Sequence, residues 1–189
     1  MDEYGTSTHR PVFMAVTACL LACGLASSAR SAEDGAGYGL GRTATEEEIR
    51  AWNIDIGPRG EGLPPGQGTV KQGAQVFAAK CAACHGSTGT EGPKDRLVGG
   101  QNTLTTPKPI RTIGSYWPYA PTLYDYIHRA MPFDAPQSLS PEEIYSVVAW
   151  LLFQNHIIEE HVVIDAQTLP KVQMPNQNGF IPDPRPDVR

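Results

Sequence analysis

The sequence predicts an all-α domain flanked by long irregular extensions. Three segments carry apolar residues at helical spacing, and each has a recognisable helix start or stop signal. The 189 residues also include 19 Gly and 17 Pro, which indicates long stretches without regular structure. We therefore divide the chain into 1–32, 33–68, 69–156 and 157–189, and expect only 69–156 to form the helical domain.

The first strong helix is expected from about Thr69 to Cys84. Its apolar residues share one face: Val70, Ala74, Phe77, Ala78 and Cys81. Gly73 costs about 0.5–1 kcal/mol relative to alanine inside a helix. Two interpretations of Gly73 stay open: close approach of another helix, or a glycine that is merely tolerated near a helix start.

The second helix is expected from about Pro121 to Ala130, with proline in its first turn. Met131 follows the helix and precedes Pro132. Because a residue before proline is disfavoured in the α conformation, the helix should end at Met131 and present its side chain from a turn.

The third helix is the clearest. Ser140 and Glu143 have the spacing of a capping box, with Pro141 at the first helical position. Apolar residues then recur every three or four positions: Ile144, Val147, Val148, Leu151 and Leu152. The helix should end near Asn155.

The extensions carry weaker signals. A short helix is expected from Thr45 to Trp52, and a short strand at 162–164. Glycine and proline prevent regular structure between 57 and 68, although the apolar residues nearby indicate that this segment lies along the domain or a partner. The chain should be extended from Leu169 and disordered at 182–189.

Residues 1–32 are typical of an export segment. The stretch from Val12 to Leu25 is apolar, and small residues follow it at an acceptable cleavage position. A lipoprotein leader with the lipid on Cys23 is the alternative. Either leader implies export to the periplasm, with membrane attachment only if Cys23 is lipidated.

The chemistry of the chain centres on the motif C-A-A-C-H. Cys81 and Cys84 can each form a thioether with a haem vinyl group, and His85 can bind the iron, as in a c-type haem site. A zinc half-site would need two more ligands, and Cys19 and Cys23 lie in the apolar leader. A thioredoxin-type pair would need a βαβ pattern, which the sequence does not show. One covalent haem c is therefore predicted.

The second axial ligand is expected to be Met131. It follows His85 with a helix between them, and a thioether is a soft ligand that favours reduced iron. His128, Met174 and an open site are the alternatives, and core packing is the usual role of an unligated methionine.

A helix leading into C-x-x-C-H, a loop, a helix ending in methionine and a terminal helix together resemble the class I cytochrome c fold over about 69–156. In that family the first and last helices cross closely. The resemblance implies that Gly73 and Phe77 meet Trp150 or Tyr145.

The same resemblance implies the surroundings of the haem. A proline carbonyl after the motif accepts the ring proton of the ligating histidine, and Pro93 is the candidate. Arg111, Tyr116 and Trp117 are candidates to bind the propionates, although aromatic residues in this run fit a core equally well.

The flanks carry a closer resemblance, over about residues 38–181. The segments that carry it are IDIGPRGEGLPPGQGTVKQG, GSYWPYAPTLYDYIHRAMPFDAPQSLSPEEIYSVVAWLL and LPKVQMPNQNGF. They are similar to the cytochrome subunit of the Sox-pathway sulfane dehydrogenase and to cytochromes paired with periplasmic sulfite dehydrogenases. The resemblance implies a molybdenum-containing partner of the sulfite oxidase family, and a downstream cytochrome c. Some family members carry a second haem, whereas this chain has one C-x-x-C-H motif, so sulfane and sulfite dehydrogenases both stay open.

Three function classes remain. The favoured one is an electron-transfer subunit, not itself the enzyme, that takes electrons from the molybdenum subunit. The others are a stand-alone carrier for another dehydrogenase or a terminal oxidase, and a haem enzyme or sensor with an open iron site. The formal charge of −5 argues against nucleic acid as a partner.

Overall fold

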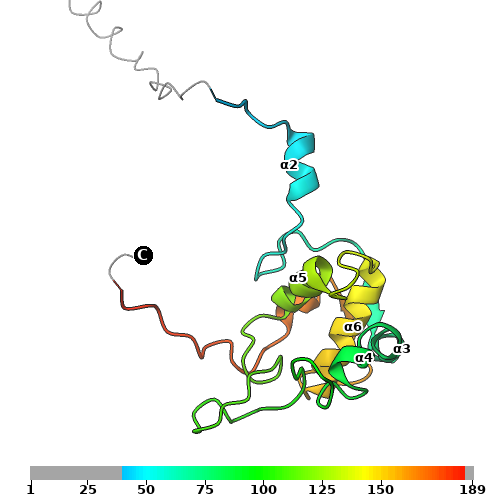
Figure 1. Cartoon of the computed structure of the whole chain (residues 1–189), viewed down its shortest axis with the longest axis vertical. Helices are drawn as coiled ribbons and strands as arrows, with labels where there is room; N and C mark the ends of the chain where they lie inside the picture. Colours follow the sequence, from blue (N-terminus) through cyan, green and yellow to red (C-terminus); the bar gives the residue numbers. More distant parts are fainter. Residues whose placement is uncertain (1–39, 186–189) are drawn as a thin grey trace, which may run out of the picture. The chain divides into compact units, whose positions relative to one another are not determined.

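The computed structural model describes residues 40–185. The export segment expected over 1–32 therefore lies outside the described residues. The chain divides into two units, 1–45 and 46–189, and the description below concerns the second. Its elements are α2 (Glu46–Trp52), β1 (Gln67–Thr69), α3 (Val70–Lys80), α4 (Ala82–His85), α5 (Ala120–Ala130), α6 (Pro141–Gln154), β2 (Val163–Asp165) and the 3-10 helix η1 (Leu169–Lys171). Figure 1 labels the α-helices. No helix within 40–185 is both long enough and apolar enough to cross a membrane.

Helix α3 begins where predicted but ends early. The Thr69 hydroxyl accepts the Gln72 N–H at 3.3 Å, and the Gln72 side chain accepts the Thr69 N–H at 3.2 Å. The predicted helix to Cys84 is interrupted at Cys81, whose φ of −123° is not helical. The separate turn α4 then carries the second thiol and His85.

The local signals for α5 and α6 are confirmed. Met131 ends α5 in an extended conformation, with φ −125° and ψ 144°, as the following Pro132 favours. Ser140 and Glu143 form the predicted capping box at the start of α6. Asn155 follows the last residue of α6 as its C-cap.

The close-approach interpretation of Gly73 is confirmed. A Cβ atom at Gly73 would lie 1.9 Å from the Ser146 carbonyl oxygen and 2.7 Å from the Trp150 Cβ, both on α6. Phe77, one turn further along α3, stacks on Trp150 with ring centroids 4.0 Å apart. Tyr145 has a different role, since its hydroxyl donates to the Pro64 carbonyl at 2.8 Å.

The domain is mostly helical, as predicted, and it also contains one short two-stranded sheet. Strands β1 and β2 pair antiparallel, with Gly68 opposite Ile164. Strand β2 begins one residue later than expected, and β1 was not predicted at all. Gly68 lies against α6, where a Cβ atom would be 2.1 Å from the Ser146 backbone nitrogen. Strand β1 has only three residues, and they have little β propensity of their own. We therefore attribute its formation to packing against α6.

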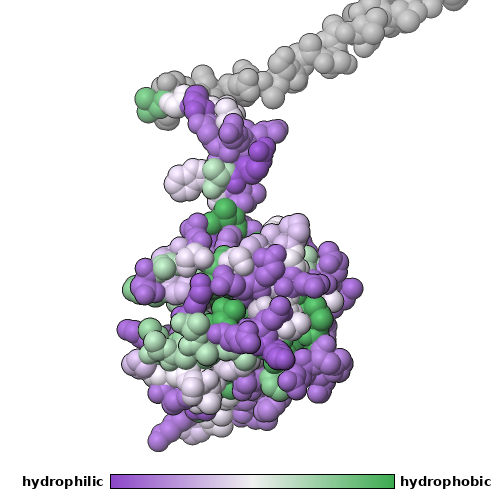
Figure 2. All heavy atoms as spheres, turned by 90° about the vertical axis from the view of Figure 1, so that its right-hand side faces the viewer, coloured by the Kyte–Doolittle hydropathy of each residue, from purple (hydrophilic) through white to green (hydrophobic). Residues whose placement is uncertain are grey.

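Both extensions contribute to the core. Ile56 is buried and Leu63 packs on the core from the N-terminal side. From the C-terminal side, Ile164, Leu169 and Met174 are buried. The expectation that the chain is extended from Leu169 is therefore wrong for η1. The face of the molecule shown in Figure 2 is mainly hydrophilic, with separate hydrophobic areas between the polar side chains.

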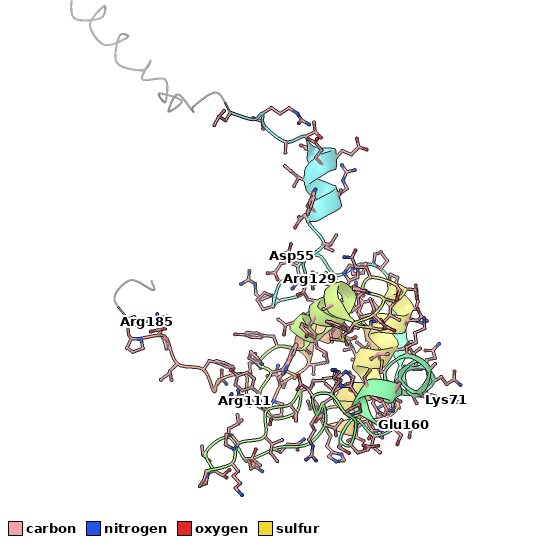
Figure 3. The ribbon with its side chains drawn as sticks, viewed as in Figure 1. Asp55, Lys71, Arg111, Arg129, Glu160 and Arg185 are labelled. Carbon is pink, nitrogen blue, oxygen red and sulfur yellow. The ribbon has the colours of Figure 1, made fainter. Side chains whose placement is uncertain are left out.

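Asp125 fastens the N-terminal extension to α5. Its carboxylate accepts the backbone N–H of Ile56 at 2.8 Å, and it also accepts hydrogen bonds from Arg129. Figure 3 shows Arg129 beside Asp55 of the same extension. Burial alone would raise the pKa of Asp125, but the hydrogen bonds from Arg129 and Ile56 outweigh it and hold that pKa below its usual value.

We expect Asp125→Asn to lower the free energy of unfolding at pH 7 by about 1–3 kcal/mol, because it disrupts buried hydrogen bonds. The pKa of Asp125 is lower in the folded than in the unfolded chain. Its contribution is therefore present above the unfolded value of about 3.9 and is lost as pH falls through the folded value. Denaturant unfolding at pH 7 and pH 3 measures both effects. The exposed Glu160→Gln serves as the control, and an equal loss for Asp125→Asn at both pH values would contradict the assignment.

Candidate functional site

A pocket of about 680 Å³ brings the predicted ligands together. It is lined by both thiols of the motif, by His85 and by Met131. Its walls are largely apolar and come from α3, α5, α6 and the loops between them: Phe77, Leu97, Ile113, Leu123, Ile127, Leu139, Val147 and Leu151. A large apolar cavity with a few convergent polar groups is the usual form of a cofactor site.

His85 is oriented by a backbone carbonyl. Its Nδ1 lies 2.8 Å from the Asp95 oxygen, which leaves Nε2 available to bind a metal. The prediction that Pro93 supplies this carbonyl is wrong, and Pro93 does not line the pocket. Gly92 explains the difference. A Cβ atom there would lie 2.2 Å from the Cys84 oxygen, so the backbone passes close under the motif and reaches His85 only at Asp95.

Three residues were considered for the second axial ligand, and of these Met131 lines the pocket. The end of α5 and the extended backbone at Met131 deliver its side chain there. Met174 is 4% exposed in the core and does not line the pocket. His128 does not line it either, and its Nδ1 is buried without a hydrogen-bond partner. The ligand role of Met131 stays a prediction, and the geometry favours it over both alternatives.

The predicted haem surroundings are brought together only in part. Arg111 and Trp117 line the pocket, whereas Tyr116 does not. The Arg111 guanidinium lies 5.5 Å from the centre of the Tyr116 ring, whose edge meets Phe180 at 5.3 Å between centroids. Arg111 is labelled in Figure 3. Tyr116 therefore contacts a wall residue and the C-terminal arm instead of the pocket.

The lining residues that the sequence analysis missed include Lys94, Arg96, Tyr126 and Phe133. The two cations fall in the Gly-rich loop after the motif, and their closeness to Cys84 and His85 in sequence was the available signal. Tyr126 packs edge-on against Trp117, with centroids 5.8 Å apart. Phe133 is 85% exposed although it borders the pocket.

Asn155, a buried residue that the sequence analysis treated only as a helix end, holds one wall of the pocket. Its Oδ1 accepts the Gly99 N–H at 2.9 Å, and its Nδ2 donates to the Leu97 carbonyl at 3.3 Å. Its own carbonyl accepts the Gln101 amide at 3.1 Å. These bonds tie the loop that carries Leu97 to the end of α6.

The electrostatics of the first thiol disfavour the thioredoxin-type alternative. Burial raises the pKa of Cys81 to about 11, whereas an attacking redox thiol needs a lowered pKa. The zinc alternative does not account for a cavity of about 680 Å³ with apolar walls. Two thiols, an imidazole with an oriented ring, a thioether and apolar walls fit a covalently attached haem.

Comparisons with known proteins agree with this fit. Residues 68–151 match the family model described as cytochrome c oxidase, cbb3-type, subunit III. A chain in the crystal structure of the sulfane dehydrogenase SoxCD from Paracoccus pantotrophus matches with 47% sequence identity and a TM-score of 0.72. The match covers 78% of this chain and 73% of that chain.

This chain belongs to the cytochrome c family. A search of curated proteins found no match. Membership of the family implies haem c, for which the pocket supplies both thiols and both candidate axial ligands. The cytochrome also resembles a chain of an oxidoreductase complex, which indicates a role in electron transfer.

We expect the cytochrome to keep its haem on a denaturing gel, because both thiols line the pocket. Peroxidase staining of the gel and acid–acetone extraction measure the attachment. The double variant Cys81→Ala/Cys84→Ala should lose the stain, whereas Ala83→Ser, a change between the two thiols, should keep it. Complete extraction of haem from the unsubstituted protein would show that the attachment is not covalent.

Proposed function

We propose that this cytochrome is a periplasmic, monohaem electron-transfer subunit with the class I fold. It accepts electrons from a molybdenum-containing subunit of the sulfite oxidase family, which oxidises sulfite or sulfane sulfur, and passes them to another cytochrome c. The observation that carries the proposal is the 47% identity to a chain of the sulfane dehydrogenase SoxCD. The export leader expected over 1–32 accounts for the compartment.

The proposal divides the work between two subunits. When bound, haem c supplies exchange of one electron at a time, whereas oxidation of sulfite removes two. We therefore assign the sulfur chemistry to the partner. In this chain, the Asp95 carbonyl orients His85. Met131 would favour the reduced state of a bound haem as a thioether ligand, and the largely apolar walls would limit the contact of the haem with water. Lys94, Arg96 and Arg111 place positive charge at the pocket, where carboxylates of a cofactor can pair with it.

The C-terminal arm has two parts. Leu169 and Met174 are buried in the core, so removing them would disrupt the fold. Beyond them, Phe180 and Ile181 remain 51% and 87% exposed, which makes 178–185 the described part of the arm available to a partner. A truncation that tests the arm should therefore begin at Asn178.

The proposal is tested with a tagged cytochrome purified from its native host. We expect a molybdenum-containing protein to co-purify with it, and sulfite or thiosulfate to reduce the haem in that complex, as measured by visible absorption. The cytochrome alone should not be reduced by either compound. Substrate-driven reduction of the cytochrome alone, or the absence of any molybdenum protein from the complex, would overturn the proposal.

The alternative is a stand-alone carrier for another dehydrogenase or a terminal oxidase. It is favoured by the description of the matching family model, which names an oxidase subunit but spans only residues 68–151. A carrier of this kind should sediment as a free monomer in extracts of its host. A heteromeric complex that is stable to gel filtration favours the dehydrogenase subunit.

A further inference from the structure

Helix α2 presents an apolar face that it does not bury. None of its seven residues is buried, and Ile49 and Trp52 are 52% and 86% exposed. They lie three positions apart, which places them on the same side of a helix. Single exposed apolar residues are common, but an exposed tryptophan beside an isoleucine forms a surface of the kind found at protein interfaces.

Helix α2 is too short to be stable without burying an apolar face. An isolated helix is marginal in water below about 12–15 residues, even with favourable composition, and most helices gain stability by packing an apolar face. Helix α2 has seven residues and buries none of them. Its stability therefore calls for a surface outside the described part of this chain.

The match to SoxCD includes this region. The matched 78% of 189 residues is about 147 residues, whereas only 137 residues follow Trp52. The resemblance must therefore extend back to α2 or beyond it, well outside the 68–151 covered by the cytochrome family model. A segment that the family model does not need is shared with a chain of a dehydrogenase complex.

The charge of α2 indicates the kind of surface it fits. Its first turn carries Glu46, Glu47 and Glu48, against one arginine, Arg50, in its last turn. An acidic helix is repelled by an anionic membrane surface. It suits a groove with an apolar floor and basic edges.

We propose that α2 docks through Ile49 and Trp52 into an apolar, basic-edged groove on the molybdenum-containing subunit. This inference rests on the proposed function and deepens it by naming the contact. The docking helix is tethered close to the domain, because Ile56, four residues after Trp52, is bound to Asp125 at 2.8 Å. Docking of α2 would therefore fix the distance between the two subunits.

The test uses the full-length holo-cytochrome and the isolated molybdenum subunit from the complex described above. We expect Trp52→Ala to weaken the affinity about 30-fold or more, as for a tryptophan hot spot. Val163→Ala is the control, because this apolar side chain of β2 is also exposed, at 39%, but lies outside α2 and outside the C-terminal segment proposed to be available to the partner. It should change the affinity much less. Amide hydrogen exchange should be fast at 49–52 in the free cytochrome and slow in the complex.

The outcomes separate this inference from the proposed function. If the subunits bind and substrate reduces the haem, but Trp52→Ala binds as tightly as the original, the docking role of α2 is wrong while the function stands. If no molybdenum subunit binds, the function itself is wrong. Self-association of the free cytochrome that Trp52→Ala abolishes would instead identify a second copy as the occupant, and would also overturn the inference.

Discussion

Trp150→Ala is expected to lower the free energy of unfolding by about 3–5 kcal/mol, because it removes a large buried ring from the crossing of α3 and α6. Trp150 is 6% exposed and stacks on Phe77. Gly73 allows the two helices to approach closely at this crossing, where a Cβ atom would lie 2.7 Å from the Trp150 Cβ. Denaturant unfolding of the holo-cytochrome, followed by far-UV circular dichroism, measures the loss.

Trp52→Ala is the matched control for this variant. It removes the same side chain from a position that is 86% exposed, so the stability of the isolated cytochrome should change by less than about 0.5 kcal/mol. The competing interpretation makes Trp150 an electron relay. Near-normal stability of Trp150→Ala combined with slowed reduction of the haem by the partner would favour that interpretation.

The helices that could be predicted are those whose limits depend on neighbouring residues. The capping box at Ser140 and Glu143 and the effect of Pro132 on Met131 act within a few residues, so the sequence alone locates them. The interruption of the first helix at Cys81 has no such local signal. Neither proline nor glycine stands there, and helical spacing of the apolar residues continues across it.

Features that depend on distant contacts were missed. Strand β1 consists of Gln67, Gly68 and Thr69, and it pairs with a strand almost a hundred residues away. No periodicity can be read from three residues, and the pairing follows from the way both extensions pack on α6. The burial of Met174 is a similar case, since a Pro-rich arm gives no sign that it returns to the core.

In the pocket too, features set by neighbouring residues could be predicted, and features set by the folded backbone could not. The motif identified Cys81, Cys84 and His85, because their chemistry requires that spacing. The carbonyl that orients His85 was assigned to Pro93 by resemblance, and the structure assigns it to Asp95, two residues later. That choice depends on how closely Gly92 passes under the motif, which only the folded backbone reveals.

Met131→Ala is expected to abolish the weak sulfur-to-iron charge-transfer band of the oxidised cytochrome and to lower its reduction potential. Met131 is the methionine at the pocket, and loss of a thioether ligand removes the preference for reduced iron. Absorption spectroscopy in the near infrared and a redox titration measure the two effects. Because Met131 ends α5 without forming its buried face, the helix content should be unchanged.

Met174→Ala is the matched control, since it removes the same side chain from the core. Met174 is 4% exposed, so this variant should lose about 2–5 kcal/mol of stability but keep the charge-transfer band and the potential. His128→Ala should keep both spectral properties too, because His128 does not line the pocket. Loss of the band in Met174→Ala, with Met131→Ala unaffected, would transfer the ligand role to Met174. Absence of the band from the unsubstituted oxidised cytochrome would favour His128 or an open site instead.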